Sequence, residues 1–271
     1  MLGLGTAVNR GGFVSATDPL LLDEYSGAAA AYSLRKLSNS YSGNCVTVRR
    51  DSDNLDANIG FSGGVLDTSA LASHCGSANG FVAAWFDQSG NSNNATQLTA
   101  SDQPKIYDGT TGNINELLFT GSEFLTLTPI SINLGLGFSA FNKRRNSSTG
   151  NKRVFIQTTS GGSDHSTGGT LLATKEFIVD GDPKVINVTA NTGDLLSTYI
   201  LTPNSGDYYI NGTLQATDSH SKTNTINPTL AQISRSSGFQ GGINELIIYN
   251  SDQSSNRTAI ESNINTFYSI Y

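Results

Sequence analysis

Charge, cysteine and long apolar runs are scarce in this 271-residue chain, and each scarcity excludes a class of protein. Charged residues make up 14% of the sequence with a formal net charge of -6, so no basic face exists for nucleic acid, which is not an expected partner. Two cysteines, Cys45 and Cys75, exclude a disulfide framework; they are either bridged or, as we favour, simply buried. No apolar stretch approaches the roughly 20 residues that span a bilayer, and no secretory signal is visible, so membrane insertion is not expected.

Short runs of apolar residues, or of alternating apolar and polar residues, make up most of the chain. The chain is 37% hydrophobic, enough for a substantial core, and from Gln103 to Tyr249 such runs are separated by turns rich in Gly, Asn and Ser. Asn211-Gly212 gives the clearest turn, because a type I′ hairpin needs positive φ at both central residues. The pattern predicts an all-β protein built as a two-sheet antiparallel sandwich.

A few short helices are also predicted. Ser26 is placed to cap a helix reaching Leu37 through four alanines. A short helix is expected from Asp67-Thr68 to Leu71, capped by an acidic or a hydroxyl side chain. Residues 254 to 268 carry apolar side chains at helical spacing, including Ile260 and Ile264, which predicts a closing amphipathic helix.

Residues 1–26 differ from the rest, and we expect an arm there and one sandwich domain over residues 27–271. Glycines interrupt the apolar residues Leu2, Leu4, Val8 and Phe13. The arm either crosses its own sandwich or docks on another subunit, and both alternatives stay open. Symmetric homo-oligomers are common, so an oligomer such as a trimer is expected.

A polar turn follows the apolar run Phe81–Phe86. Its residues Asp87, Gln88 and Asn91 are candidate carbohydrate ligands, because carboxylates and planar amides bind paired hydroxyls. The favoured interpretation is structural, since Asp after a strand commonly closes a turn by bonding its own backbone. Trp85 lies within the apolar run, and we expect it in the core rather than stacked on a sugar.

Two further patterns are weaker. Asp51, Asp53 and Asp56 offer three carboxylates that would suit calcium, although a solvated acidic loop beside two arginines explains them better, and no cofactor is expected. The segment Ile-Asn-Glu-Leu occurs at 114–117 and again at 243–246, which is too short to indicate a duplication.

Three stretches together resemble known families. The YSG…VRR…SDN stretch from Tyr41 and the WFDQSGNSNNATQ stretch from Trp85 resemble the amino-terminal part of the catalytic sandwich of fungal B-type α-L-arabinofuranosidases. GGINELIIYN, followed by NRTAIESNINTFYSIY, resembles the closing strand and helix of concanavalin A-like and laminin G-like jelly rolls. The whole arrangement is similar to virion components of tailed phages. The resemblance implies a concanavalin A-like jelly roll.

The resemblance does not place an active site. The enzyme pattern has Tyr where this chain has Phe86, and neither the nucleophile nor the acid falls on a numbered residue. The sequence offers carboxylates without pairing them: Asp53, Asp87, Glu116, Glu123, Asp207 and Glu245.

The expected function is therefore non-enzymatic. We expect a phage virion protein, namely a capsid decoration, head fibre or tail-associated adhesin located in the virion. Its amino-terminal arm attaches to other virion proteins, and its lectin-like sandwich is displayed outward, where cell-surface glycans are candidate ligands. The alternatives are a glycoside hydrolase of arabinofuranosidase type and a free carbohydrate-binding module.

Overall fold

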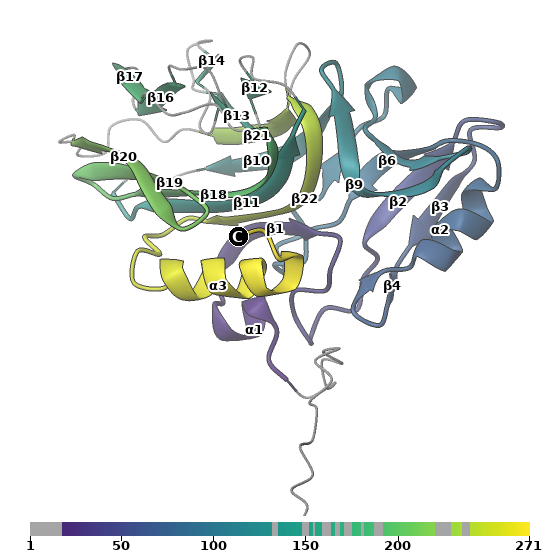
Figure 1. Ribbon diagram of the computed structural model, residues 1–271, viewed down its shortest axis with the longest axis horizontal. Helices are drawn as coiled ribbons and strands as arrows, with labels where there is room; N and C mark the ends of the chain where they lie inside the picture. The colour runs from purple at the N-terminus through teal and green to yellow at the C-terminus, as the bar shows by residue number, and fades with distance from the viewer. Residues whose placement is uncertain are drawn as a thin grey trace, which may run out of the picture.

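One large antiparallel sheet forms most of the molecule (Figure 1). The computed structural model describes residues 18–131, 135–147, 192–219, 229–234 and 239–271, with the backbone alone at 218, 219, 229 and along the strands between 152 and 186. The sheet's strands are β1 (Ala28–Ser33), β2 (Val46–Arg50), β3 (Asp56–Ile59), β6 (Gly80–Trp85), β7 (Ala95–Thr96), β8 (Lys105–Asp108), β9 (Gly112–Thr120), β10 (Phe124–Ser131), β11 (Phe138–Asn146), β13 (Phe155–Thr158), β14 (Asp164–His165), β18 (Gly193–Leu201), β19 (Ser205–Ile210), β20 (Thr213–Ser219), β21 (Thr229–Ser234) and β22 (Gln240–Tyr249).

Smaller elements surround this sheet. Three two-stranded ribbons are formed by β4 (Phe61–Ser62) with β5 (Val65–Leu66), β12 (Lys152–Arg153) with β15 (Gly169–Thr170), and β16 (Lys175–Val179) with β17 (Asp182–Ile186). The helices are α1 (Leu21–Glu24), α2 (Thr68–Cys75), α3 (Arg257–Tyr268) and a 3-10 turn at Ala100–Asp102. Within the described residues, every helix is too short or too polar to cross a membrane.

The sheet curls so that two layers face each other, as the sequence predicted for a sandwich. Strands β22, β11, β18 and β19 form one layer, and β10, β21 and β13 lie across from them (Figure 1). The core between the layers contains Phe138, Leu246 and Trp85, all fully buried. Trp85 packs against Tyr32 with ring centroids 5.6 Å apart, so its predicted core position is confirmed.

A second cluster of apolar side chains lies on the other face of the β11–β22 layer. Phe141 and Ile247 from the strands pack there with Ile260 and Ile264 of α3 and with Leu21 of α1. We call this helix-covered side the outer face and the side toward the sandwich core the inner face. The predicted closing helix is thus confirmed, because its apolar stripe seals the outer face.

The helix predicted from Ser26 to Leu37 is wrong. Residues 28–33 form β1, which pairs antiparallel with β22, including Tyr32 with Leu246. Ala30 and Tyr32 are buried on the inner face, whereas Ala28 and Ala31 are buried on the outer face. Alanine favours helix only weakly against tertiary pairing, and a strand buried on both faces needs no polar alternation.

Other local predictions hold. Asp67 caps α2 by accepting a hydrogen bond from the Ala70 amide at 2.9 Å. Asn211 and Gly212 have φ of 50° and 73°, as the predicted type I′ turn between β19 and β20 requires. Residues 18–26 pack on the sandwich through Leu21 and Leu22. The arm over residues 1–26 stays a prediction, and Leu2, Leu4, Val8 and Phe13 lie outside the described residues.

The polar turn after β6 supplies hydrogen-bond partners to the edge of β1 that does not pair with β22. The Ala31 amide donates to Asp87 Oδ1 at 2.8 Å, and Gln88 Nε2 donates to the carbonyls of Ser33 and Arg35 at 3.0 Å each. Gln88 Oε1 also accepts from the Leu37 amide at 2.8 Å. Backbone groups that would otherwise need a neighbouring strand are therefore satisfied by side chains.

Removing the Gln88 amide should destabilise the whole sandwich. We expect Gln88→Ala to lower the free energy of unfolding by about 2–4 kcal/mol, because three buried backbone groups lose their partner. Urea denaturation followed by tryptophan fluorescence measures this change. Gln215→Ala is the control, since its single bond to the Thr213 carbonyl is exposed and its loss should cost less than about 0.5 kcal/mol. Equal effects of the two substitutions would contradict the structural role of Gln88.

Both cysteines are buried free thiols, which agrees with the favoured alternative. Burial raises the pKa of Cys45 and of Cys75, so little thiolate forms at neutral pH. We expect a thiol reagent such as dithionitrobenzoate to react slowly with the native chain and to titrate both thiols in denaturant. A denatured chain that presents no reactive thiol would show that the two residues are bridged.

Candidate functional site

A group of polar side chains lies on the inner face of the β11–β18–β19 layer, where a sandwich normally has only apolar ones. We call it the inner polar cluster. Its members are Asn142, Arg144, Asn146, Ser197, Tyr199 and Tyr208, all buried. Their position follows from register: Arg144 lies opposite Leu195 and Ile243, which both belong to the core between the layers.

Arg144 is the centre of this cluster. It is fully buried, and its guanidinium donates to Ser197 Oγ, to Asn146 Oδ1 at 3.2 Å and to the Tyr208 hydroxyl at 3.5 Å. These described partners are neutral hydroxyl and amide groups. Burying a cation costs free energy unless its hydrogen bonds are satisfied, so a cation at this position needs a reason.

Asn142 adds a second anomaly, two residues before Arg144 on the same face. It is fully buried, and among the described residues neither its amide nitrogen nor its amide oxygen has a hydrogen-bond partner. Unsatisfied buried amides are uncommon in native proteins, so this one calls for an explanation.

Two tyrosines form the wall beside them. The rings of Tyr199 and Tyr208 lie 4.6 Å apart at 32°. Burial and the neighbouring Tyr208 raise the pKa of Tyr199, so its hydroxyl stays protonated at neutral pH. The cluster therefore combines a cation, amides and hydroxyls, all of which are able to hydrogen-bond the hydroxyl groups of a ligand.

Strand β11 ends and strand β18 begins at this cluster. Asn146 is the last residue of β11 and pairs with Gly193, the first residue of β18. The connection between them contains the ribbon β16–β17, in which Glu176 pairs with Val185. It carries four carboxylates: Asp164, Glu176, Asp180 and Asp182.

The outer face of the same layer holds charges that compensate each other. Arg35 binds Glu245 through two hydrogen bonds of 2.7 and 2.9 Å, and the Ser33 hydroxyl donates to Glu245 at 2.7 Å. Lys143 pairs with Asp194, and Arg145 with Glu116. The Lys-Arg-Arg run is thus split by strand alternation, with Arg144 alone directed inward.

The structure assigns fold contacts to all six carboxylates that the sequence left unpaired. Each one binds a neighbouring cation, hydroxyl or backbone amide: Asp53 with Arg50, Asp87 with Ala31, Glu116 with Arg145, Glu123 with Thr120, Asp207 with Thr217 and Glu245 with Arg35. Each of the six thus binds a partner of the fold, and no two of them bind each other.

The predicted ligand residues Asp87, Gln88 and Asn91 do come together, but their polar atoms bind the backbone. Asn91 Nδ2 donates to the carbonyl of Ala28 at 2.9 Å, and Ser89 donates from its amide to Asp87 Oδ1 at 2.8 Å, closing the expected turn. A cavity of about 290 Å³ adjoins the turn and is lined in part by Gln88. Ligand binding by these three residues stays a prediction.

In the acidic loop, Asp51 and Asp53 also bind neighbouring side chains. Asp53 binds Arg50, which holds the pKa of Asp53 at about 2, and Asp51 accepts from Asn79. Asp56 begins β3. Across the part of the chain that the structure describes, there is no group of three or more His, Cys, Asp or Glu side chains that could hold a metal.

Sequence reasoning missed the inner polar cluster. The signal was available in the stretch FNKRRN of β11, where polar residues continue the alternation begun by apolar ones. A short basic run is more often a solvated surface, and only the pairing of β11 with a strand on each side shows that it is buried.

Comparisons with known proteins identify the fold. Residues 24–152 match the family model for the catalytic domain of α-L-arabinofuranosidase B. A mutant of a GH54 α-L-arabinofuranosidase soaked with 4-nitrophenyl α-L-arabinofuranoside aligns with a TM-score of 0.66 at 14% identity, covering 88% of this chain and 62% of that chain.

Two further solved structures align over the same shares at 14% identity: an arabinofuranosidase complexed with arabinofuranosyl-α-1,2-xylobiose, with a TM-score of 0.65, and a GH54 α-L-arabinofuranosidase soaked with a cyclic sulfate inhibitor, with a TM-score of 0.66. Comparison with curated proteins gives no match. The chain thus has the fold of an arabinofuranosidase catalytic sandwich and spans 62% of the length of these solved chains.

These findings correct the function expected from sequence. The family model and the three solved structures are those of glycoside hydrolases, so the expectation of a non-enzymatic phage virion protein is wrong. The similarity to concanavalin A-like and laminin G-like families is not supported either, whereas the similarity to the arabinofuranosidase sandwich is confirmed.

The unsatisfied amide of Asn142 gives a test of the site. Asn142→Leu should raise the free energy of unfolding by about 1–2 kcal/mol, because it removes a buried polar group without a partner. The matched control is Asn146→Leu on the same strand and face, which removes a partner of Arg144. This substitution should lower the free energy of unfolding by about 1–3 kcal/mol. Chemical denaturation measures both. A loss of stability in both variants would contradict this assignment.

Proposed function

We propose that this chain is the catalytic sandwich of a glycoside hydrolase that cleaves α-L-arabinofuranosides. The observation that carries the proposal is the match of residues 24–152 to the arabinofuranosidase B catalytic model, together with a fold that aligns over 88% of the chain. Two of the aligned structures were solved with an arabinofuranoside or an arabinofuranosyl xylobiose. Terminal arabinofuranosyl groups are accordingly the substrate class.

The inner polar cluster supports binding of such a sugar. The Asn142 amide offers a donor and an acceptor inside the sandwich, on the same face as the buried guanidinium of Arg144. Hydroxyl groups of a sugar both donate and accept, so a mixed set of this kind suits them better than it suits an ion. A buried unsatisfied amide lowers stability, and proteins retain such groups where binding or catalysis uses them.

Hydrolysis needs two carboxyl groups in different roles. One carboxylic acid protonates the glycosidic oxygen of the leaving group, while the other carboxylate attacks the anomeric carbon or activates the water that attacks it. The described buried carboxylates are held by fold contacts, as shown above for Asp87, Glu116 and Glu245, and Glu261 is bound by Arg257. We therefore place the two catalytic groups among Asp164, Glu176, Asp180 and Asp182, on the connection that starts and ends at the inner polar cluster.

The test is release of nitrophenol from 4-nitrophenyl α-L-arabinofuranoside by the full chain. We expect hydrolysis by the parent, and for two of the four substitutions Asp164→Asn, Glu176→Gln, Asp180→Asn and Asp182→Asn we expect a loss of about 100-fold or more in kcat. The amides are nearly isosteric with the carboxyls, so melting temperatures should stay close to that of the parent.

Asp53→Asn is the matched control, because Asp53 binds Arg50 in an exposed loop and should leave kcat unchanged. A parent without activity on aryl arabinofuranosides and on arabinofuranosyl xylo-oligosaccharides would refute the proposed activity. Full activity in all four variants would instead refute the placement of the carboxyl groups.

A further inference from the structure

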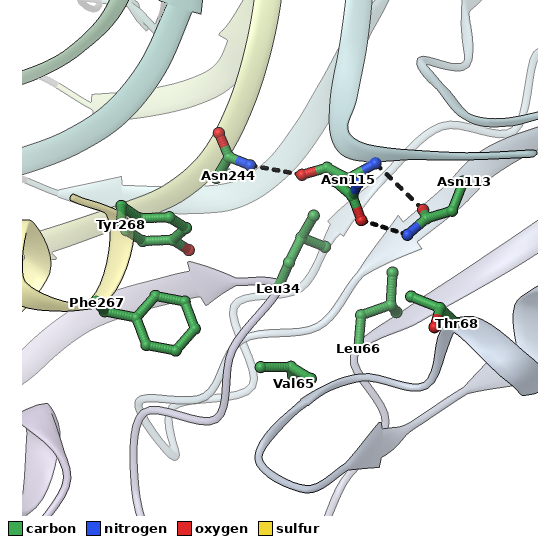
Figure 2. A pocket seen from close by; sticks show the side chains of 9 residues that line it. All are labelled: Leu34, Val65, Leu66, Thr68, Asn113, Asn115, Asn244, Phe267 and Tyr268. Carbon is green, nitrogen blue, oxygen red and sulfur yellow. Dashed lines mark hydrogen bonds between the residues drawn. The ribbon is translucent and has the colours of Figure 1, made fainter. Parts of the chain in front are cut away.

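A pocket that is lined by none of the residues of the inner polar cluster opens beside the end of α3 (Figure 2). It has a volume of about 340 Å³ and lies where β9, β22, the β4–β5 ribbon and the end of α3 meet (Figure 2). That volume is at the lower end of the roughly 300–1,000 Å³ typical of ligand pockets. The lining residues are Leu34, Val65, Leu66, Thr68, Asn113, Asn115, Asn244, Phe267 and Tyr268.

All of the lining side chains are uncharged. The charges next to the lining are paired: Arg35 binds Glu245 through two hydrogen bonds, and Lys143, which also donates to Asn244, is paired with Asp194. The Tyr268 hydroxyl lies 3.3 Å from Glu245. Burial, with Glu245 adding to it, raises the pKa of Tyr268, so this hydroxyl stays neutral. Nothing in the lining compensates a charge on a ligand, which favours a neutral occupant.

The polar side of the pocket is built by the repeated Ile-Asn-Glu-Leu segment. Its two copies lie next to each other because β9 pairs antiparallel with β22, so Asn244 Nδ2 donates to the Asn115 carbonyl at 2.6 Å. Asn115 has a left-handed φ of 62°, and Asn113 Nδ2 donates to Asn115 Oδ1. Figure 2 shows the three asparagines in a row along one side.

Donor capacity remains at this row. Lys143 donates to Asn244 Oδ1 at 3.1 Å and fixes the orientation of that amide, leaving one Asn244 N–H without a recorded partner among the described residues. Among the described residues, both side-chain N–H groups of Asn115 also lack a partner, since the side-chain bond to Asn113 uses the Asn115 oxygen. Preoriented amide donors of this kind bind hydroxyl groups.

The opposite side of the pocket is apolar and partly exposed. Phe267 is 43% exposed and Val65 is 41% exposed, and Figure 2 shows them facing the asparagine row across Leu34. The Arg35 guanidinium lies 4.7 Å from the Phe267 ring centroid, so one ring face is covered and held in place. A rigid exposed aromatic ring opposite amide donors fits a molecule with one apolar face and a polar edge.

We propose that this pocket is a second saccharide site, separate from the hydrolytic one, which takes one or two units of a neutral sugar chain. The C–H face of the sugar packs on Phe267 and Val65, and its hydroxyl edge binds Asn115 and Asn244. Such a site would hold the polysaccharide backbone while the catalytic face acts on a side group. The binding itself requires no hydrolysis and is tested without it.

The test is a titration of the ¹⁵N-labelled full chain with xylobiose, xylotetraose, arabinose and glucose, followed by NMR. Side-chain amide signals report directly on Asn113, Asn115 and Asn244. We expect saturable shifts of these signals with at least one of the sugars. Shifts confined to other residues, or none at tens of millimolar sugar, would overturn the proposal whether or not the chain hydrolyses arabinofuranosides.

Two variants sharpen the result. Asn115→Gly removes the amide without backbone strain, because glycine accepts a left-handed φ, and Phe267→Ala removes an exposed ring; each should weaken binding about tenfold. The matched controls are Asn54→Gly, at φ 59° in another loop, and Tyr271→Ala, another exposed ring; both should bind as the parent does. Parent-like affinity in both pocket variants would overturn the proposal.

Discussion

The side chains of Asp87, Gln88 and Asn91 hold β1 in the middle of the molecule by binding its backbone, and much of the structure depends on this contact. β1 pairs with β22 on one edge only, and the turn satisfies the other edge through the amide of Ala31 and the carbonyls of Ala28 and Ser33. With β1 held in this position, Arg35 binds Glu245 on the outer face, and α1 packs against Leu37 beside α3. The loop whose sequence suggests a ligand site thus fixes β1, and the packing on both faces of the layer depends on the position of β1.

Strand β11 distributes the chemistry of the molecule between these faces. Alternation sends Asn142 and Arg144 to the inner side and Lys143 and Arg145 to the outer side. The outward cations find carboxylates, so that face is electrostatically balanced, whereas the described partners of Arg144 are neutral. Stability alone explains the outer arrangement. The inner one costs stability, and the binding of a hydroxyl-rich substrate that we propose would give it a reason.

The two proposed sites use different physical means because they serve different tasks. Hydrolysis needs directed charges in a water-poor surrounding, and the buried residues of the inner polar cluster offer such a surrounding. Holding a neutral chain needs only an exposed ring and fixed amide donors, which the junction of Asn115, Asn244 and Phe267 provides near the surface. A glycosidase that trims side groups from a long polymer benefits from both, since retention of the backbone raises the local concentration of cleavable groups.

Local periodicity and turn chemistry are enough to predict the all-β class, the Asn211–Gly212 hairpin, a capped helix after Asp67 and the closing helix. The buried thiols follow from the usual burial of free cysteine. Long-range strand pairing makes the alanines at 28–31 a strand, since pairing with β22 outweighs their helix propensity. It also decided that Arg144 points inward and that the repeated asparagines meet. Contacts such as Asn115 with Asn244 join residues far apart in the chain, and no local pattern encodes which strands become neighbours.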